Sequence, residues 1–231
     1  MLTSACAITY ASFYFNISFN VDLTLLSIAI IFPLVFAIRG SFRRREKALE
    51  HLSEFKSTLN TLKYYLISKN DRSKEFIDNV NNILLEINNT VIAHLGAKNK
   101  GMHEVDKSTD KLYQFILANE AVISRQVREK SFRFMKDMHE SVENLNSIHI
   151  HRTPISMKAY CLIFVYIFPF IYAPEVIKNV GDYQSSVIVY LIVIVTQFIL
   201  ISLYNIQDQL EHPFDSVGVD DINLDNYRIN R

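Results

Sequence analysis

Charged side chains are excluded from long stretches of this 231-residue chain. Residues 1–38 contain a single Asp, Glu, Lys, Arg or His, which is Asp22, and residues 159–174 and 183–207 contain none. By contrast, residues 41–160 hold 20 of the 24 Lys and Arg residues. A soluble domain spreads charge over its whole surface, whereas this segregation indicates lipid around both ends of the sequence and water around the middle. We therefore predict an integral membrane protein.

The composition predicts an all-α fold. Only 5 Gly and 5 Pro occur in the chain, which leaves few turn residues for a sheet. The formal net charge is zero and the mean hydropathy is +0.10, values that would also suit a soluble protein. These averages over the whole chain conceal the difference between its apolar segments and its charged segments. The cysteines, Cys6 and Cys161, both lie in apolar segments, so we expect buried thiols and no disulfide framework.

Two spans are predicted in the C-terminal half. Tyr183–Gln207 offers 25 uncharged residues, which as a helix would extend about 37 Å and cross a hydrocarbon core of about 30 Å. Ala159–Pro174 is shorter, and we expect this crossing helix to break near its exit because Pro169 and Pro174 lie within it or at its end.

Two further spans are predicted at the N-terminus, giving four in total. Leu2–Phe15 and Leu23–Ile38 are both short, with a break at Asn16–Asp22, and Arg39 can extend the second span by snorkelling. A cleaved signal peptide is the alternative interpretation. It is disfavoured because the chain has neither a basic start nor a convincing small-residue cleavage site.

Basic residues beside the spans predict the orientation. Arg152 and Lys158 precede the third span, whereas the two loops expected outside hold a single basic residue, Lys178. The residues that follow the second span are Arg39, Arg43, Arg44, Arg45 and Lys47. The positive-inside rule therefore places both termini and the central region in the cytoplasm, with the spans in the plasma membrane.

Hydrophobic periodicity divides the chain into four parts. We expect a first transmembrane pair (1–40), a cytosolic helical region (41–155), a second transmembrane pair (156–207) and an acidic cytosolic tail (208–231). The expected cytosolic elements are a helix over Phe42–Leu66 that continues the second span, a helix over Ser73–Leu95, a loop over Gly96–Asp110, and helices over Lys111–Ile123 and Ser124–Ser147.

The sequence predicts no catalytic or metal site. It contains no phosphate-binding Gly-rich loop, no His-Glu-x-x-His, no Cys-x-x-Cys and no nucleophile elbow. His149 and His151 are alternate residues at an expected helix end, where surface histidines are the more common interpretation. Nucleic-acid binding is not expected, because acidic residues offset the basic ones. A proton relay is not expected either, because the last two spans carry no charge.

Three stretches of the chain share a further pattern. In the second span Ile28, Phe32 and Phe36 recur at four-residue intervals, which places them on one helix face. The third span begins after Arg152-Thr-Pro. The fourth is followed by Glu211-His-Pro-Phe, then by the acidic pair Asp220 and Asp221 and by Leu224-Asp225.

These stretches resemble the bestrophin family in its prokaryotic-type form, and the order of elements agrees over nearly the whole chain. The resemblance implies a homopentameric ion channel, not an enzyme, that conducts passively through a pore lined by the second span. Family members have a hydrophobic neck of three residues on this helix, which match Ile28, Phe32 and Phe36. Five copies of three apolar rings would form a constriction able to gate by dewetting. The alternative for the two Phe side chains is packing against a neighbouring span.

The resemblance leaves the conducted ion open. Animal members pass chloride, and prokaryotic-type members can favour cations. Arg39, Arg43 and Arg44 near the cytoplasmic mouth favour anions if they face the lumen, so we expect a chloride channel. The expected partners are membrane lipid, inorganic ions and further copies of the chain.

The resemblance also suggests two other features. Asp220 and Asp221 match the calcium clasp of animal bestrophins, although prokaryotic-type members are not expected to depend on calcium, so we expect no cofactor and no firm metal site. A second, cytosolic constriction would lie near Ile123 or Val127. The chain departs from the pattern at Arg45-Glu46, where an aromatic pair is usual, and at Pro33 within the neck helix.

A second interpretation belongs to another functional class. A membrane-anchored scaffold or sensor would use its spans only as an anchor and bind a partner through the cytosolic bundle, Phe42–Ile150. Stoichiometry distinguishes the two, because a pore requires several subunits around an axis.

Overall fold

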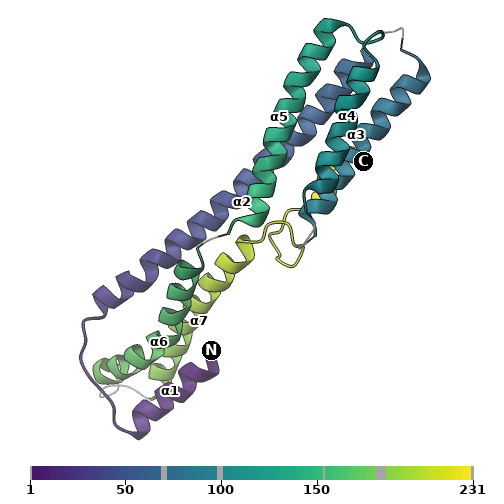
Figure 1. Ribbon diagram of the computed structural model, residues 1–231. Helices are drawn as coiled ribbons and strands as arrows, with labels where there is room; N and C mark the ends of the chain where they lie inside the picture. The colour runs from purple at the N-terminus through teal and green to yellow at the C-terminus, as the bar shows by residue number, and fades with distance from the viewer. Residues whose placement is uncertain (1, 69–71, 98–100, 153, 181–185, 230–231) are drawn as a thin grey trace. The chain divides into compact units, whose positions relative to one another are not determined.

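The computed structural model describes residues 2–68, 72–97, 101–152, 154–180 and 186–229. Over these residues the chain folds only into helices and connecting segments, so the predicted all-α class is confirmed. Figure 1 shows the helices α1 (Leu2–Tyr14), α2 (Leu23–Ile67), α3 (Lys74–Leu95), α4 (His103–Ala118), α5 (Arg125–Ile150), α6 (Ile155–Val180) and α7 (Ser186–Leu210). A short 3₁₀ helix, η1 (Leu224–Tyr227), follows α7 in the chain.

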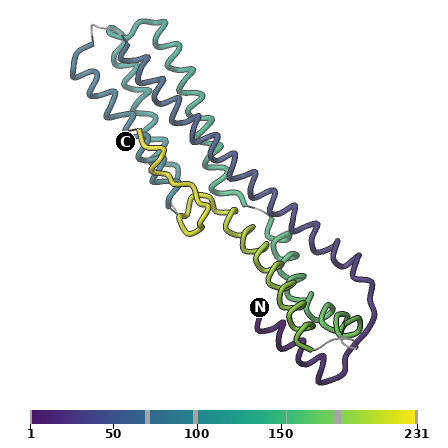
Figure 2. The backbone as a smooth tube through the Cα atoms, turned by 180° about the vertical axis from the view of Figure 1, so that it is seen from behind, coloured from purple at the N-terminus to yellow at the C-terminus, as the bar shows by residue number. Residues whose placement is uncertain are grey.

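The chain forms two compact units. The first comprises Met1–Arg43 and Thr153–Glu211, and the second comprises Arg44–Arg152 and His212–Arg231. The boundary falls within α2, which Figure 2 traces as one uninterrupted helix of 45 residues. The prediction that the helix of the second span continues without a break beyond Gly40 to Leu66 is therefore confirmed.

The first unit is built from α1, α6, α7 and the beginning of α2. Ala5 of α1 packs with Ala173 and Val176 of α6 and with Val189 and Val193 of α7. A second apolar cluster joins α2 to the other helices. Its buried members are Ile30, Leu34, Cys161, Val165, Phe168 and Leu200.

The structure supports membrane insertion, but it does not support all four predicted spans. Three ranges are long and apolar enough to cross a membrane: Leu23–Ile67, Arg125–Val180 and Ser186–Leu210. With 13 residues, α1 extends only about 20 Å, which is shorter than the hydrocarbon core. The start of the predicted fourth span, at Tyr183, lies outside the described residues.

The second unit is a helical bundle with its own core. The predicted helix over Phe42–Leu66 is confirmed, and it buries one apolar face in this core. The fully buried residues on that face include Leu52, Phe55, Leu59, Leu62 and Leu66. Ser73 caps the start of α3, because its side chain accepts a hydrogen bond from the Phe76 amide at 3.2 Å. Phe214 and Ile222 of the C-terminal segment are buried in the same core.

The predicted loop over Gly96–Asp110 is wrong in its second half, because α4 begins at His103. This helix buries a narrow stripe that contains Val105, Leu112 and Ile116. Its hydroxyl residues do not break it, since Ser108 and Thr109 donate to carbonyls of the preceding turn. A polar composition therefore concealed an amphipathic helix.

The predicted break of the third span is also wrong. α6 continues through Pro169 and Pro174 to Val180. A proline removes the donor for the carbonyl four residues earlier, and for Pro169 that carbonyl belongs to Val165. The Gln197 side chain of α7 donates to it at 3.0 Å, so a neighbouring helix replaces the missing hydrogen bond.

Candidate pore-lining face of helix α2

The beginning of α2 has two opposite faces. Ile30, Leu34 and Ala37 are buried against the rest of the first unit. Ile28, Phe32 and Phe36 are 55%, 62% and 49% exposed. Because successive residues turn by about 100°, Phe32 and Leu34 point to nearly opposite sides of the helix. The predicted neck residues thus form a continuous apolar stripe that no other part of the described first unit covers.

The stripe ends in exposed arginines. Arg39 follows Phe32 by seven residues and Arg43 follows Phe36 by seven, which is almost two full turns, so both lie close to the same line. Both side chains are exposed. Arg44 differs, since it is partly buried and donates to the His151 carbonyl within the second unit. Of the three predicted mouth residues, helix geometry thus places Arg39 and Arg43 on the stripe but not Arg44.

The end of the first unit where α6 begins and α7 ends holds a polar cluster that the sequence did not predict. The Lys158 ammonium pairs with the Asp208 carboxylate and lies 3.3 Å from the Glu211 carboxylate, whose side chain is 2% exposed. The Gln207 amide donates to Glu211 at 3.1 Å and to the hydroxyl of Ser41 at 3.4 Å.

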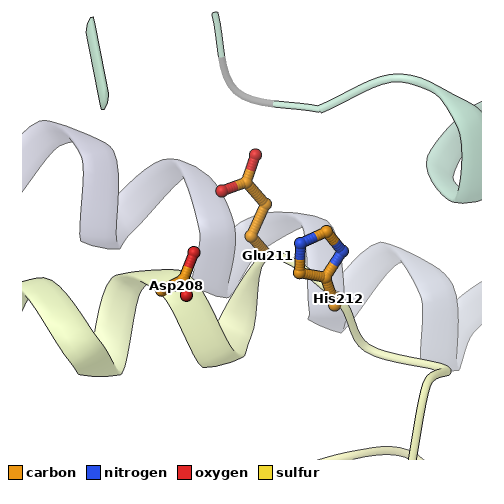
Figure 3. A group of neighbouring side chains, drawn as sticks. All are labelled: Asp208, Glu211 and His212. Carbon is orange, nitrogen blue, oxygen red and sulfur yellow. The ribbon is translucent and has the colours of Figure 1, made fainter. Parts of the chain in front are cut away.

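The Lys158 ammonium contacts both carboxylates and balances one of their two negative charges. Figure 3 shows Asp208 and Glu211 at the end of α7, followed in the chain by His212, which begins the second unit. Ser41 belongs to α2, so the cluster attaches that helix to α6 and α7. The one signal in the sequence was the i, i+3 spacing of Asp208 and Glu211.

The opposite end of the first unit has a second buried carboxylate. Glu175 of α6 is 5% exposed, and its two oxygens accept hydrogen bonds from the Val21 amide and from the Asn179 side chain, both at 2.7 Å. Asp22, the next residue after Val21, accepts from the Thr24 amide and so caps the start of α2. Glu175 therefore fixes the segment from which α2 begins.

The predicted calcium residues form a turn in the second unit. An Asp221 oxygen accepts a hydrogen bond from the Gly218 amide at 2.9 Å, and burial, together with the neighbouring Asp215, raises the pKa of Asp221. The Asp220 side chain is exposed, and its carbonyl accepts from Arg45 at 2.7 Å. The carboxylate of Asp221 thus already serves a structural role.

The residues considered for a second constriction lie elsewhere in the second unit. Ile123 is 1% exposed and belongs to the core of the bundle, whereas Val127 is partly buried against that core.

Known structures share this fold although sequence comparison finds no relative. No family model matches the chain, and no curated protein matches it. A bacterial bestrophin homologue from Klebsiella pneumoniae matches with a TM-score of 0.77 at 13% identity, over 98% of this chain and 92% of that one. Two variants of the Klebsiella protein match with TM-scores of 0.81 and 0.80 at 14% and 12% identity, over the same shares of both chains. The chain therefore has a bestrophin-like fold.

Proposed function

We propose that the protein is a passive ion channel, not an enzyme, in which five copies surround a pore lined by the stripe Ile28, Phe32 and Phe36. The observation that carries this proposal is the exposure of the stripe on the side of α2 opposite to its buried face. The likeness of the whole chain to bestrophin homologues supports the same arrangement. Rings of apolar side chains repeated at each turn give a narrow constriction that can gate by losing its water.

The exposed arginines give the proposal an ion preference. Arg39 and Arg43 continue the stripe toward the cytoplasmic end, so a pore lined by α2 would carry two rings of positive charge below its neck. Such rings attract anions, and we propose chloride as the physiological ion. The basic residues beside the spans support a plasma-membrane protein with both termini in the cytoplasm. We further propose that conduction needs no bound calcium or other cofactor.

The test is ion flux through the purified protein in liposomes, under a chloride gradient and then a potassium gradient. A Phe32→Ala/Phe36→Ala variant removes both rings of the stripe. A Phe170→Ala/Phe198→Ala variant is the matched control, because it removes two phenylalanines that are 60% and 56% exposed on α6 and α7. We expect higher basal flux from the first variant only, with a reversal potential that follows chloride.

Two results would contradict the channel proposal, and a third would contradict its ion preference. Equal flux from both variants, at equal yield of assembled pentamer, would place Phe32 and Phe36 outside the pore. A monomeric protein without flux would favour the membrane-anchored scaffold. A reversal potential that follows potassium would retain the channel but overturn its anion preference.

A further inference from the structure

Pro33 leaves a carbonyl of α2 without its helical donor. In an α-helix the amide of each residue donates to the carbonyl four residues earlier, and Pro33 has no amide hydrogen, so the Ala29 carbonyl loses its partner. A carbonyl in a membrane core cannot use water instead. The Tyr160 hydroxyl of α6 lies 3.3 Å from this oxygen and donates to it.

The same replacement occurs once more in the first unit. Pro169 of α6 frees the Val165 carbonyl, and the Gln197 side chain of α7 donates to it at 3.0 Å. Gln197 is 2% exposed, and its hydrogen bond to the Val165 carbonyl accounts for an amide side chain buried at this place in α7. Two transmembrane prolines therefore each receive a side-chain donor from the next helix, α7 to α6 and α6 to α2.

The bond from Tyr160 lies within the proposed neck. Ala29 follows Ile28 directly, and Pro33 follows Phe32 directly, so the interrupted turn is the one that sets the spacing of these two rings. A helix that lacks one hydrogen bond bends easily at that point. The Tyr160 hydroxyl of α6 stabilises one backbone geometry at this turn of α2. Without that donor, the turn can change its geometry.

We propose that Tyr160 is a positioning residue for the neck: its hydroxyl replaces the hydrogen bond that Pro33 removes and thereby holds Ile28 and Phe32 in register. This inference rests on the proposed channel function. The hydrogen bond from Tyr160 to Ala29 connects α6 directly to the proposed constriction. A movement of α6 would therefore change the positions of Ile28 and Phe32 through this bond.

The experiment is a double-mutant cycle in the full-length protein in liposomes. Tyr160→Phe removes only the hydroxyl, and Pro33→Ala restores the amide that donates to Ala29. We expect Tyr160→Phe to change unitary conductance or the ratio of chloride to potassium permeability several-fold in the native background. In the Pro33→Ala background the same change should have no effect, because Ala29 then has its helical donor. Tyr166→Phe, which removes an exposed hydroxyl from α6, is the matched control.

The outcomes separate this inference from the channel proposal. An equal effect of Tyr160→Phe in both backgrounds, or none in either, would overturn the inference even if Phe32→Ala/Phe36→Ala opens the pore. Coupling seen in the melting temperature but not in conductance or permeability would also overturn it, since the bond would then be merely structural. Failure of the channel proposal itself would appear as unchanged flux in the Phe32→Ala/Phe36→Ala variant.

Discussion

The rings of Phe32 and Phe36 meet edge to face, with centroids 4.8 Å apart and an interplanar angle of 78°. This geometry is the favourable one for aromatic pairs, because the positive edge of one ring faces the negative face of the other. Each ring limits the rotamers of the other, so we expect the two Phe side chains of the proposed neck to change conformation together.

This contact predicts non-additive effects on conduction. Phe32→Ala and Phe36→Ala should each raise basal flux, and the double variant should raise it by less than the product of the two, because either change already frees the remaining ring. The flux of all four proteins in liposomes measures the coupling. Strict multiplicativity would show that the rings act independently.

Loss of the Glu175 carboxylate should loosen the start of α2. Glu175→Ala leaves the Val21 amide without its acceptor, and we expect a loss of about 1–3 kcal/mol in the free energy of unfolding. Glu175→Gln should lower the free energy of unfolding by less, because the amide oxygen of Gln can still accept the hydrogen bond from the Val21 amide. Thermal unfolding in detergent checks both, with the exposed neighbour Lys178→Ala as the control. Equal melting temperatures for Glu175→Ala and Lys178→Ala would contradict the anchoring role.

Lys158 should stabilise the contact between α6 and the end of α7. Lys158→Ala removes a cation from beside the buried carboxylate of Glu211. We expect the free energy of unfolding to fall by about 1–3 kcal/mol. This loss is smaller than for a fully buried ion pair, because Lys158 is 29% and Asp208 49% exposed. Lys158→Ala/Glu211→Gln should recover part of the loss in a denaturation experiment. A double variant no more stable than Lys158→Ala would contradict the pairing.

Acid should destabilise the helical bundle of the second unit through His149. Burial, with further contributions from His94 and Arg152, lowers the pKa of His149 below its ordinary value of 6.5. The unfolded chain therefore binds a proton at a higher pH than the folded one, so stability should fall as the pH drops from 6.5 through the folded pKa. Replacing His149 by Asn should flatten this slope in melting temperatures measured against pH, whereas His103→Asn, at an exposed position, should not. A slope unchanged by His149→Asn would assign the acid sensitivity to other groups.

Calcium should not control conduction. Asp221 already caps a turn through the Gly218 amide, and Asn can supply the same acceptor. We therefore expect equal flux with calcium and with a chelator, and equal flux from Asp220→Asn and Asp221→Asn variants. A calcium-dependent flux that both substitutions abolish would instead identify a clasp of the kind found in animal bestrophins.

The local pattern of residues was sufficient for the class of fold and for most helices. The absence of charge in 23–38 and 183–207 and the hydrophobic periodicity of Phe42–Leu66 predicted α2 and α7, because burial of a helix face depends on periodicity within one segment. The cap at Ser73 was predictable for the same reason, since a cap involves residues three positions apart. The four-residue spacing of Ile28, Phe32 and Phe36 placed them on one helix face, and the resemblance to bestrophins suggested that this face lines a pore.

Tertiary structure decided how α2 is held in place. Its contacts join Val21 to Glu175 and Ala29 to Tyr160, pairs that lie 154 and 131 residues apart. It also decided that α6 passes through Pro169, because the replacement donor, Gln197, belongs to another helix. No local pattern specifies such pairs: a buried carboxylate or carbonyl must find a donor in three dimensions, and only the packing of the helices determines which side chain supplies it.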